Sequence, residues 1–178
     1  MITLTAIKTD HKQYGEVEKL MNLSFPQAER RDNDLQRFTT DNNPLFKCMM
    51  ITDNEEFIGL VTLWDLDSFI YVEHLATLPQ CRNRGYGLQI IEQLKSWAGS
   101  RILVLEVEKP EDEMSRRRIG FYQRCGFKLC QKDYLQPPYR KGEGMLALSI
   151  MFAGTDNIDN IFESVKRKIY ENAYQYTE

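Results

Sequence analysis

The spacing of hydrophobic and polar positions along the chain predicts five helices. Apolar residues three or four positions apart share one face of a helix, while the polar residues between them face water. The clearest case is residues 85–98, where four apolar residues stand three positions apart with charged residues between them. Gly126, followed by the apolar Phe127, predicts a left-handed end to the helix before it. By these criteria helices are expected at residues 11–25, 28–41, 85–98, 112–125 and 157–174.

Runs rich in β-branched and aromatic residues predict seven strands. They are expected at residues 2–7, 45–52, 57–65, 69–77, 102–107, 127–131 and 145–152. The runs between residues 45 and 77 indicate an antiparallel meander. The strand, helix and strand around residues 85–98 instead require a right-handed crossover between parallel neighbours. The expected fold class is therefore α/β: a mixed, mostly antiparallel sheet with helices on both faces and an extra C-terminal helix.

Length and charge narrow the class of protein. A chain of 178 residues with 42% hydrophobic residues can bury a core without metal or disulfide support. With 23 basic and 26 acidic residues the net charge is −3, which argues against a general nucleic-acid binder. The longest uncharged apolar stretch, residues 144–155, is shorter than the ~18 residues of a membrane helix. We expect neither a nucleic-acid nor a membrane partner.

The cysteines and histidines indicate no metal site. The four cysteines form no Cys-x-x-Cys pair, and the two histidines stand alone. The first residues alternate like a strand and lack the basic-then-apolar order of a secretion signal. We therefore expect free thiols, a cytoplasmic location and no metal.

The most informative segment is the turn between the strand at residues 69–77 and the helix at residues 85–98. Arg82 and Arg84 precede Gly85 and Gly87, and the helix opens there. Glycines let the backbone approach a ligand, and the free N–H groups of a first helical turn attract anions. A pyrophosphate is the expected occupant. The alternative is a tight turn beside solvated arginines.

Two motifs in this context resemble the Gcn5-related N-acetyltransferase (GNAT) superfamily. Its signature, Gln/Arg-x-x-Gly-x-Gly/Ala, is met by residues 82–87 (Arg-Asn-Arg-Gly-Tyr-Gly). Residues 121–127 (Phe-Tyr-Gln-Arg-Cys-Gly-Phe) are similar to the family's Tyr-x-x-x-Gly-Phe helix end. The resemblance implies a GNAT-like sheet with a splayed central parallel pair, and an acetyl-CoA-dependent N-acetyltransferase. The expected domain covers residues 1–153. Residues 154–178 form a helical extension that packs on the domain or on a partner subunit, with a homodimer as one possibility.

The resemblance also implies which residues bind acetyl-CoA. The exposed backbone of the strand would pair with the pantetheine arm, and the turn would hold the pyrophosphate. The implied coenzyme-binding residues are Leu75, Ala76, Thr77, Arg82, Asn83, Arg84, Gly85, Tyr86, Gly87 and Leu88. Many members carry an asparagine where this chain has Arg116, so that role is not transferred. Arg116, Arg117 and Arg118 are expected either to lie near the phosphates or to form a solvated basic face of their helix.

Acetyl transfer to an amine needs a base for the amine proton and an acid for the departing thiolate. By the resemblance, Tyr122 donates a proton to the CoA thiolate; the alternative is a core aromatic residue. Glu73 is the candidate base, because it projects from the strand before the signature. Its alternative role is a structural carboxylate paired with an arginine. His74 points to the opposite face of that strand and is expected to be a core histidine.

The acceptor is expected to be a small-molecule amine. In this family the first two helices and the loop between the last two strands shape the acceptor pocket. Aromatic walls and a carboxylate there would suit an ammonium group. The candidate acceptor-binding residues are Phe25, Glu29, Arg30, Tyr71 and Tyr139. Alternatively, Phe25 and Tyr139 only pack in the core, and residues 29–32 form the solvated start of a helix. At the level of function, the alternatives are a module that binds or senses acetyl-CoA without turnover, and a protein or peptide N-acetyltransferase.

Overall fold

The computed structural model describes residues 1–178, and its contacts group them into two compact units. The first unit holds residues 1–65 and 72–97, and the second holds residues 66–71 and 98–178. The proposed boundary at residue 153 stays a prediction.

The strands form one eight-stranded sheet. Their bounds are β1 (Ile2–Ile7), β2 (Phe46–Asp53), β3 (Glu56–Asp65), β4 (Phe69–Thr77), β5 (Ile102–Glu108), β6 (Lys128–Leu129), β7 (Tyr134–Gln136) and β8 (Leu146–Ala153). Their order is β1-β2-β3-β4-β5-β8-β6, with β7 paired to β8. The sheet is mostly antiparallel, and β4 and β5 are parallel neighbours, which confirms the predicted fold class. Residues 72–77 of β4 belong to the first unit and residues 69–71 to the second.

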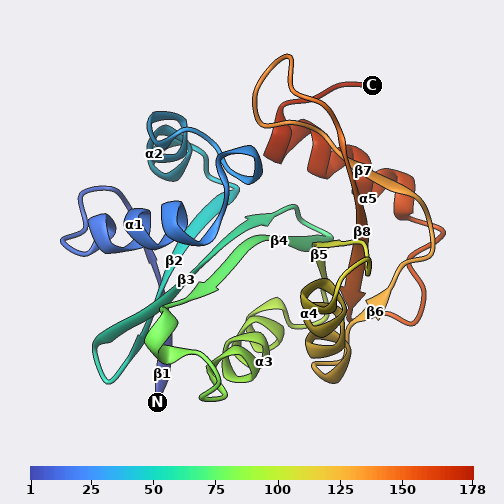
Figure 1. The fold of residues 1–178 in the computed structure, drawn as a ribbon. Coiled ribbons are helices and arrows are strands. Elements are labelled where there is room, and N and C mark those ends of the chain that lie inside the picture. Colours follow the sequence, from blue (N-terminus) through green and yellow to red (C-terminus); the bar gives the residue numbers. More distant parts are fainter. The chain divides into compact units, whose positions relative to one another are not determined.

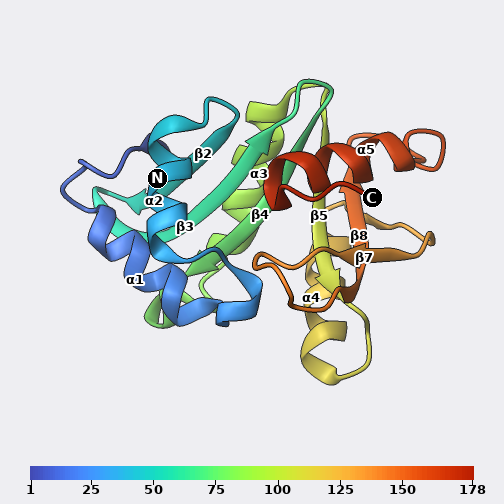
Figure 2. The same cartoon turned by 90° about the horizontal axis from the view of Figure 1, so that it is seen from above.

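Helices cover both faces of the strands in the first unit. Helices α1 (Tyr14–Ser24) and α2 (Asn33–Asn42) lie on one face, and α3 (Tyr86–Ala98) lies on the other (Figures 1 and 2). Leu20 of α1 and Ile91 of α3 are almost fully buried. Strands β2 and β3 pair antiparallel, as the meander predicted between residues 45 and 77 requires, and β1, which was not part of that meander, pairs antiparallel with β2. The apolar stripes of these helices therefore pack as their spacing predicts.

The structure differs from the single helix expected at residues 28–41. A short 3-10 turn at Gln27–Glu29 is followed by extended backbone at Arg30, and α2 begins only at Asn33. Between them Arg31 is 5% exposed and reaches Glu73 on β4 with its guanidinium. Because this partner lies far away in the sequence, local periodicity gives no sign that the backbone leaves the helix here.

The second unit is built around β8, which pairs antiparallel with β5, β6 and β7. Helix α4 (Glu113–Arg124) begins with a capping box formed by Asp112 and Ser115. It ends at Arg124, and the φ of 85° at Gly126, two residues later, confirms the predicted left-handed stop. Helix α5 (Phe162–Ile169) continues into a π-helical turn at Tyr170–Tyr174. Local capping chemistry thus fixes both ends of α4.

Three elements of the second unit differ from expectation. Strand β7 was not predicted, because it has only three residues and is defined by its pairing of Tyr134 with Leu148 on β8. The strand expected at residues 127–131 is only the two residues of β6. The helix expected at residues 157–174 begins at Phe162, after turns at residues 157–161. In each case long-range pairing or turn geometry overrides the local pattern.

Candidate active site

The turn between β4 and α3 is an open loop of the first unit. A 3-10 turn at Pro79–Cys81 follows β4, and Arg82 to Gly85 are exposed before α3 begins at Tyr86. Asn83 and Gly85 both have left-handed backbone, with φ of 60° and 80°. Apart from Gly85 itself and its two chain neighbours, no heavy atom of the protein lies within 4 Å of a Cβ placed on Gly85. Glycine is therefore favoured here by the backbone angle, and the space beside it is open for a ligand.

Tyr86 fixes the start of α3 to the end of β2. Its hydroxyl donates a hydrogen bond of 2.9 Å to Asp53. This hydrogen bond to a carboxylate is the main cause that raises the pKa of Tyr86, and desolvation is the second. The guanidinium of Arg84 lies 5.5 Å from the centre of the Tyr86 ring. The side chain of Tyr86 thus anchors the loop, which leaves its main-chain N–H among the groups available to an anion at the helix start.

Glu73 lies in a buried, bidentate ion pair with Arg31. The guanidinium nitrogens are 2.6 and 3.0 Å from its two oxygens, and the side chains are 0% and 4% exposed. Trp64 Nε1 donates a third hydrogen bond of 3.2 Å to Glu73. Sequence reasoning anticipated an arginine partner only as the alternative to a base, and it did not identify Arg31. The observed geometry fits that alternative, while the role of base stays a prediction.

His74 is a buried core residue, as expected. It is 3% exposed, its Nδ1 lies 2.9 Å from the hydroxyl of Thr62, and its Nε2 lies 2.9 Å from the carbonyl oxygen of Glu29. Burial is the main cause that lowers its pKa. The ring of Phe25 meets it edge-on at 4.6 Å. His74 therefore holds residues 25–29 against β4 and is neutral at neutral pH.

Three of the five predicted acceptor residues gather around His74 in the first unit. The ring of Phe25 contacts the ring of His74, and the carbonyl oxygen of Glu29 faces its Nε2. Arg30 Nε donates a hydrogen bond of 3.0 Å to the carbonyl oxygen of Phe25. The other two predicted residues, Tyr71 and Tyr139, belong to the second unit. The structure thus divides the predicted set into two groups, one in each unit.

Tyr71 and Tyr139 meet at Tyr174 of the C-terminal turn. The hydroxyls of Tyr71 and Tyr174 are 3.0 Å apart, and the rings of Tyr139 and Tyr174 are 4.8 Å apart. Tyr174 in turn donates a 2.7 Å hydrogen bond to Glu106 on β5. Sequence reasoning missed both Tyr174 and Glu106. The available signal was Glu106 itself, a charged residue between the buried Leu105 and Val107, since such a group must find partners.

Tyr122 projects from α4 of the second unit and is half-buried. Its ring packs against Phe121 and Phe127, with centroids 5.2 and 5.6 Å away. Burial raises the pKa of its hydroxyl to about 12. The phenol therefore keeps its proton throughout the neutral range, as an acid in catalysis must.

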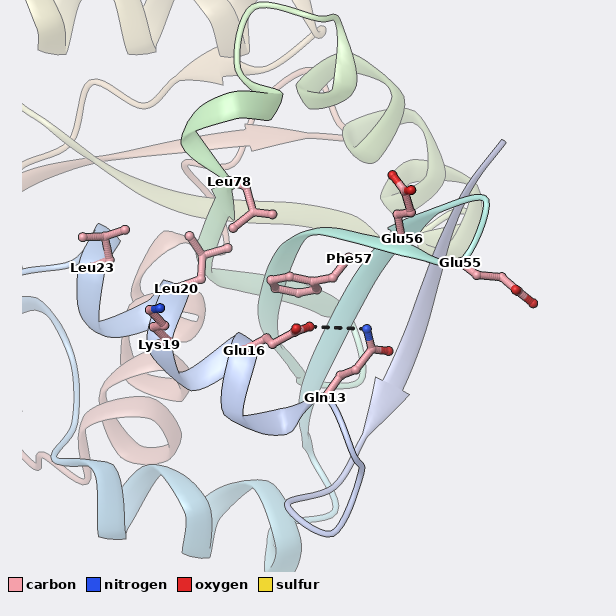
Figure 3. A pocket seen from close by; sticks show the side chains of 9 residues that line it. All are labelled: Gln13, Glu16, Lys19, Leu20, Leu23, Glu55, Glu56, Phe57 and Leu78. Carbon is pink, nitrogen blue, oxygen red and sulfur yellow. Dashed lines mark hydrogen bonds between the residues drawn. The ribbon is translucent and has the colours of Figure 1, made fainter.

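A pocket of about 490 Å³ lies in the first unit, lined by residues of α1, the start of β3 and Leu78 after β4 (Figure 3). Leu20, Leu23, Phe57 and Leu78 supply apolar surface, and Gln13 donates a 3.3 Å hydrogen bond to Glu16 at its edge. None of the residues predicted to bind coenzyme or acceptor lines it. In addition, no three His, Cys, Asp or Glu side chains are grouped to hold a metal, and no helix has the length and apolar character to cross a membrane.

Comparison with known proteins shows which family the sequence matches. Residues 14–127 match the model of the acetyltransferase (GNAT) family. A Bacillus subtilis protein, YjbC, with the provisional description of an acetyltransferase is 28% identical over 63% of this chain. The chain spans 59% of that relative's length.

Solved structures show the same fold over most of the chain. A structure from Bacteroides thetaiotaomicron, provisionally described as a GNAT-family acetyltransferase, is 40% identical with a TM-score of 0.94, covering 98% of this chain and 99% of its own. A Vibrio cholerae spermidine N-acetyltransferase chimera is 15% identical with a TM-score of 0.63, over 85% and 94% of the two chains. Arabidopsis thaliana Naa50, solved with the bisubstrate analogue CoA-Ac-MVNAL, is 14% identical with a TM-score of 0.62, over 86% and 99%.

Proposed function

Because the chain belongs to the acetyltransferase (GNAT) family, we propose that it transfers an acetyl group from acetyl-CoA to the primary amine of a small molecule. The observation that carries the proposal is the turn between β4 and α3, where exposed arginines and left-handed Gly85 open into the helix. Two features support the proposal: the turn has the family's signature sequence, and no other part of the chain lies within 4 Å of a Cβ placed on Gly85. The spermidine and peptide enzymes are too distant in sequence to indicate which amine this chain accepts.

The residues of the turn suit a diphosphate. Arg82 and Arg84 are exposed beside it, and the N–H groups at the start of α3 lack intrahelical partners, as in any helix. The positive end of the helix dipole adds to their attraction. The main chain of Leu75 to Thr77 would pair with the pantetheine arm. Acetyl-CoA supplies the activated thioester, and these residues bind and orient it.

The transfer proceeds by direct attack in a ternary complex. The neutral amine attacks the acetyl carbonyl, the C–N bond forms, and the C–S bond breaks. Tyr122 donates its proton to the departing thiolate and recovers one that the amine releases. A phenol with a pKa of about 12 is a weaker acid than a thiol of about 8.5. The proton transfer must therefore be concerted with cleavage of the C–S bond.

Binding of the coenzyme is expected to depend on the two arginines of the turn. Replacing Arg82 or Arg84 by glutamine should weaken the Kd for acetyl-CoA about 10-fold each, because each removes a charge-assisted hydrogen bond. Isothermal titration calorimetry measures this, with exposed Arg167→Gln of α5 as the matched control. Affinity that is equal in all three variants and the wild type would exclude the turn as the phosphate site.

The class of acceptor can be tested by release of free CoA thiol with a panel of amines. We expect turnover with small primary amines and little with peptides that have a free N-terminus. Turnover with peptides alone would indicate a peptide N-acetyltransferase. Tight binding of acetyl-CoA without thiol release on any amine would instead support a sensing module. The measurement thus separates three functions that share the same coenzyme site.

A further inference from the structure

Asp53 is a carboxylate close to the turn that is proposed to bind phosphates. It lies at the end of β2, and one of its oxygens accepts the 2.9 Å hydrogen bond from the hydroxyl of Tyr86, the first residue of α3. A negative charge at this place repels the phosphates of a coenzyme, so by its charge alone it would weaken their binding. Its presence beside the turn therefore calls for another role.

The carboxylate of Asp53 is held in one orientation. Its other oxygen accepts a hydrogen bond of 3.0 Å from the nitrogen of Met1, and its side chain is 26% exposed. The hydrogen bond from Met1 and then the one from Tyr86 are the main causes that lower the pKa of Asp53. At neutral pH the acceptor of the Tyr86 hydroxyl is thus an ionised, fixed carboxylate, which accepts a stronger hydrogen bond than a neutral group would.

The turn between β4 and α3 is anchored at its two ends. At its start the N–H of Arg82 donates a 3.3 Å hydrogen bond to the carbonyl oxygen of Pro79. At its end the hydroxyl of Tyr86 is bound to Asp53. Residues 82–85 between these anchors are exposed. The first end is therefore held by the main chain, whereas the second end depends on a side chain.

The ring of Tyr86 supports Arg84. The guanidinium of Arg84 lies 5.5 Å from the centre of this ring, within the range of a cation–π interaction, and the side chain stays exposed. A long side chain that already rests on a fixed ring loses less conformational entropy when it binds a ligand. Tyr86 therefore holds the charge of Arg84 at the turn, and Asp53 holds Tyr86.

Resting on the function proposed above, we propose that Asp53 is a positioning residue for acetyl-CoA. Through the hydroxyl of Tyr86 it fixes the start of α3, whose free N–H groups bind the diphosphate, and it keeps Arg84 at the same place. The pre-organised turn loses less entropy on binding, and this gain outweighs the repulsion between the carboxylate and the phosphates. Asp53 itself needs no contact with the coenzyme.

The first test removes the hydrogen bond and keeps the ring. In Tyr86→Phe the Kd for acetyl-CoA, measured by isothermal titration calorimetry, should rise about 5-fold. The KM for acetyl-CoA should rise equally, with kcat unchanged. The matched control is Gln93→Ala, which removes the 2.6 Å hydrogen bond from Gln93 of α3 to the carbonyl oxygen of Ile2. Gln93 lies about two turns beyond Tyr86, so its loss should lower the melting temperature and leave the Kd unchanged.

Two variants of Asp53 separate its hydrogen bond from its charge. Asp53→Asn keeps an oxygen that accepts from the Tyr86 hydroxyl but removes the charge, whereas Asp53→Ala removes both. We expect Asp53→Asn to bind acetyl-CoA at least as tightly as the wild type, and Asp53→Ala to bind it about 5-fold more weakly. Tighter binding in both variants would show that Asp53 acts on the coenzyme only through its charge, which would overturn the inference.

Coupling to the two arginines distinguishes positioning from general damage to the fold. Arg84→Gln should weaken binding about 10-fold in the wild type but only about 3-fold in Tyr86→Phe. Arg82→Gln should cost the same in both backgrounds, because Arg82 is held by Pro79. Equal costs for Arg84→Gln in both backgrounds, or a wild-type Kd in Tyr86→Phe and Asp53→Ala, would overturn this inference alone. A wild type that binds no acetyl-CoA would overturn the proposed function, and the inference with it.

Discussion

Replacing Tyr122 by phenylalanine is expected to lower kcat by about 100- to 10,000-fold, the range for loss of a positioned general acid. The substitution keeps the ring contacts with Phe121 and Phe127 and removes only the hydroxyl. The Kd for acetyl-CoA and the melting temperature should therefore stay close to those of the wild type. Steady-state kinetics measures kcat, and titration and scanning calorimetry on the same preparations measure the Kd and the melting temperature.

The control for Tyr122→Phe is Tyr176→Phe, which removes a hydroxyl from another half-buried tyrosine. An equal loss of coenzyme affinity and kcat/KM in Tyr122→Phe would show that the hydroxyl serves binding and not proton donation. A kcat within a few-fold of the wild type would mean that the thiolate leaves without help from Tyr122. Either result would remove Tyr122 from the mechanism.

Much of the fold was predictable because its signals are local. The strand expected at residues 69–77 is β4 without change, and Gly126 ends α4 as its sequence indicates. Helical periodicity and capping depend on residues within one or two turns, so a single sequence contains them. The same holds for the turn between β4 and α3, whose glycines and arginines are contiguous.

The parts that could not be predicted depend on partners far away in the sequence. Arg31 leaves the helical pattern to reach Glu73, 42 residues later. The cluster at Glu106 draws Tyr174 from 68 residues away. Only the charge of Glu106, between two apolar residues of β5, gave a sign in the sequence. Partners of this kind require the three-dimensional structure, because nothing in local periodicity selects one arginine or tyrosine from many.

Separating the buried pair of Arg31 and Glu73 is expected to cost about 3–5 kcal/mol of unfolding free energy. In Arg31→Leu the carboxylate of Glu73, 0% exposed, would lose its counter-charge and two hydrogen bonds. Glu73→Leu would leave the guanidinium of Arg31 beside the rings of Phe46 and Trp64, at 5.7 and 5.4 Å. Urea denaturation of both variants and of the double variant measures the coupling.

The double variant should lose much less stability than the two single changes added together, since it leaves no unpaired buried charge. Additive losses of unfolding free energy would show that the interaction between Arg31 and Glu73 itself contributes little to stability. Glu73→Gln then separates structure from catalysis, because it removes the charge while nearly preserving the shape of the side chain. If Glu73 serves structure, the folded fraction of this variant keeps the acidic limb of the wild-type pH–rate profile. If that limb disappears in Glu73→Gln, the base is Glu73.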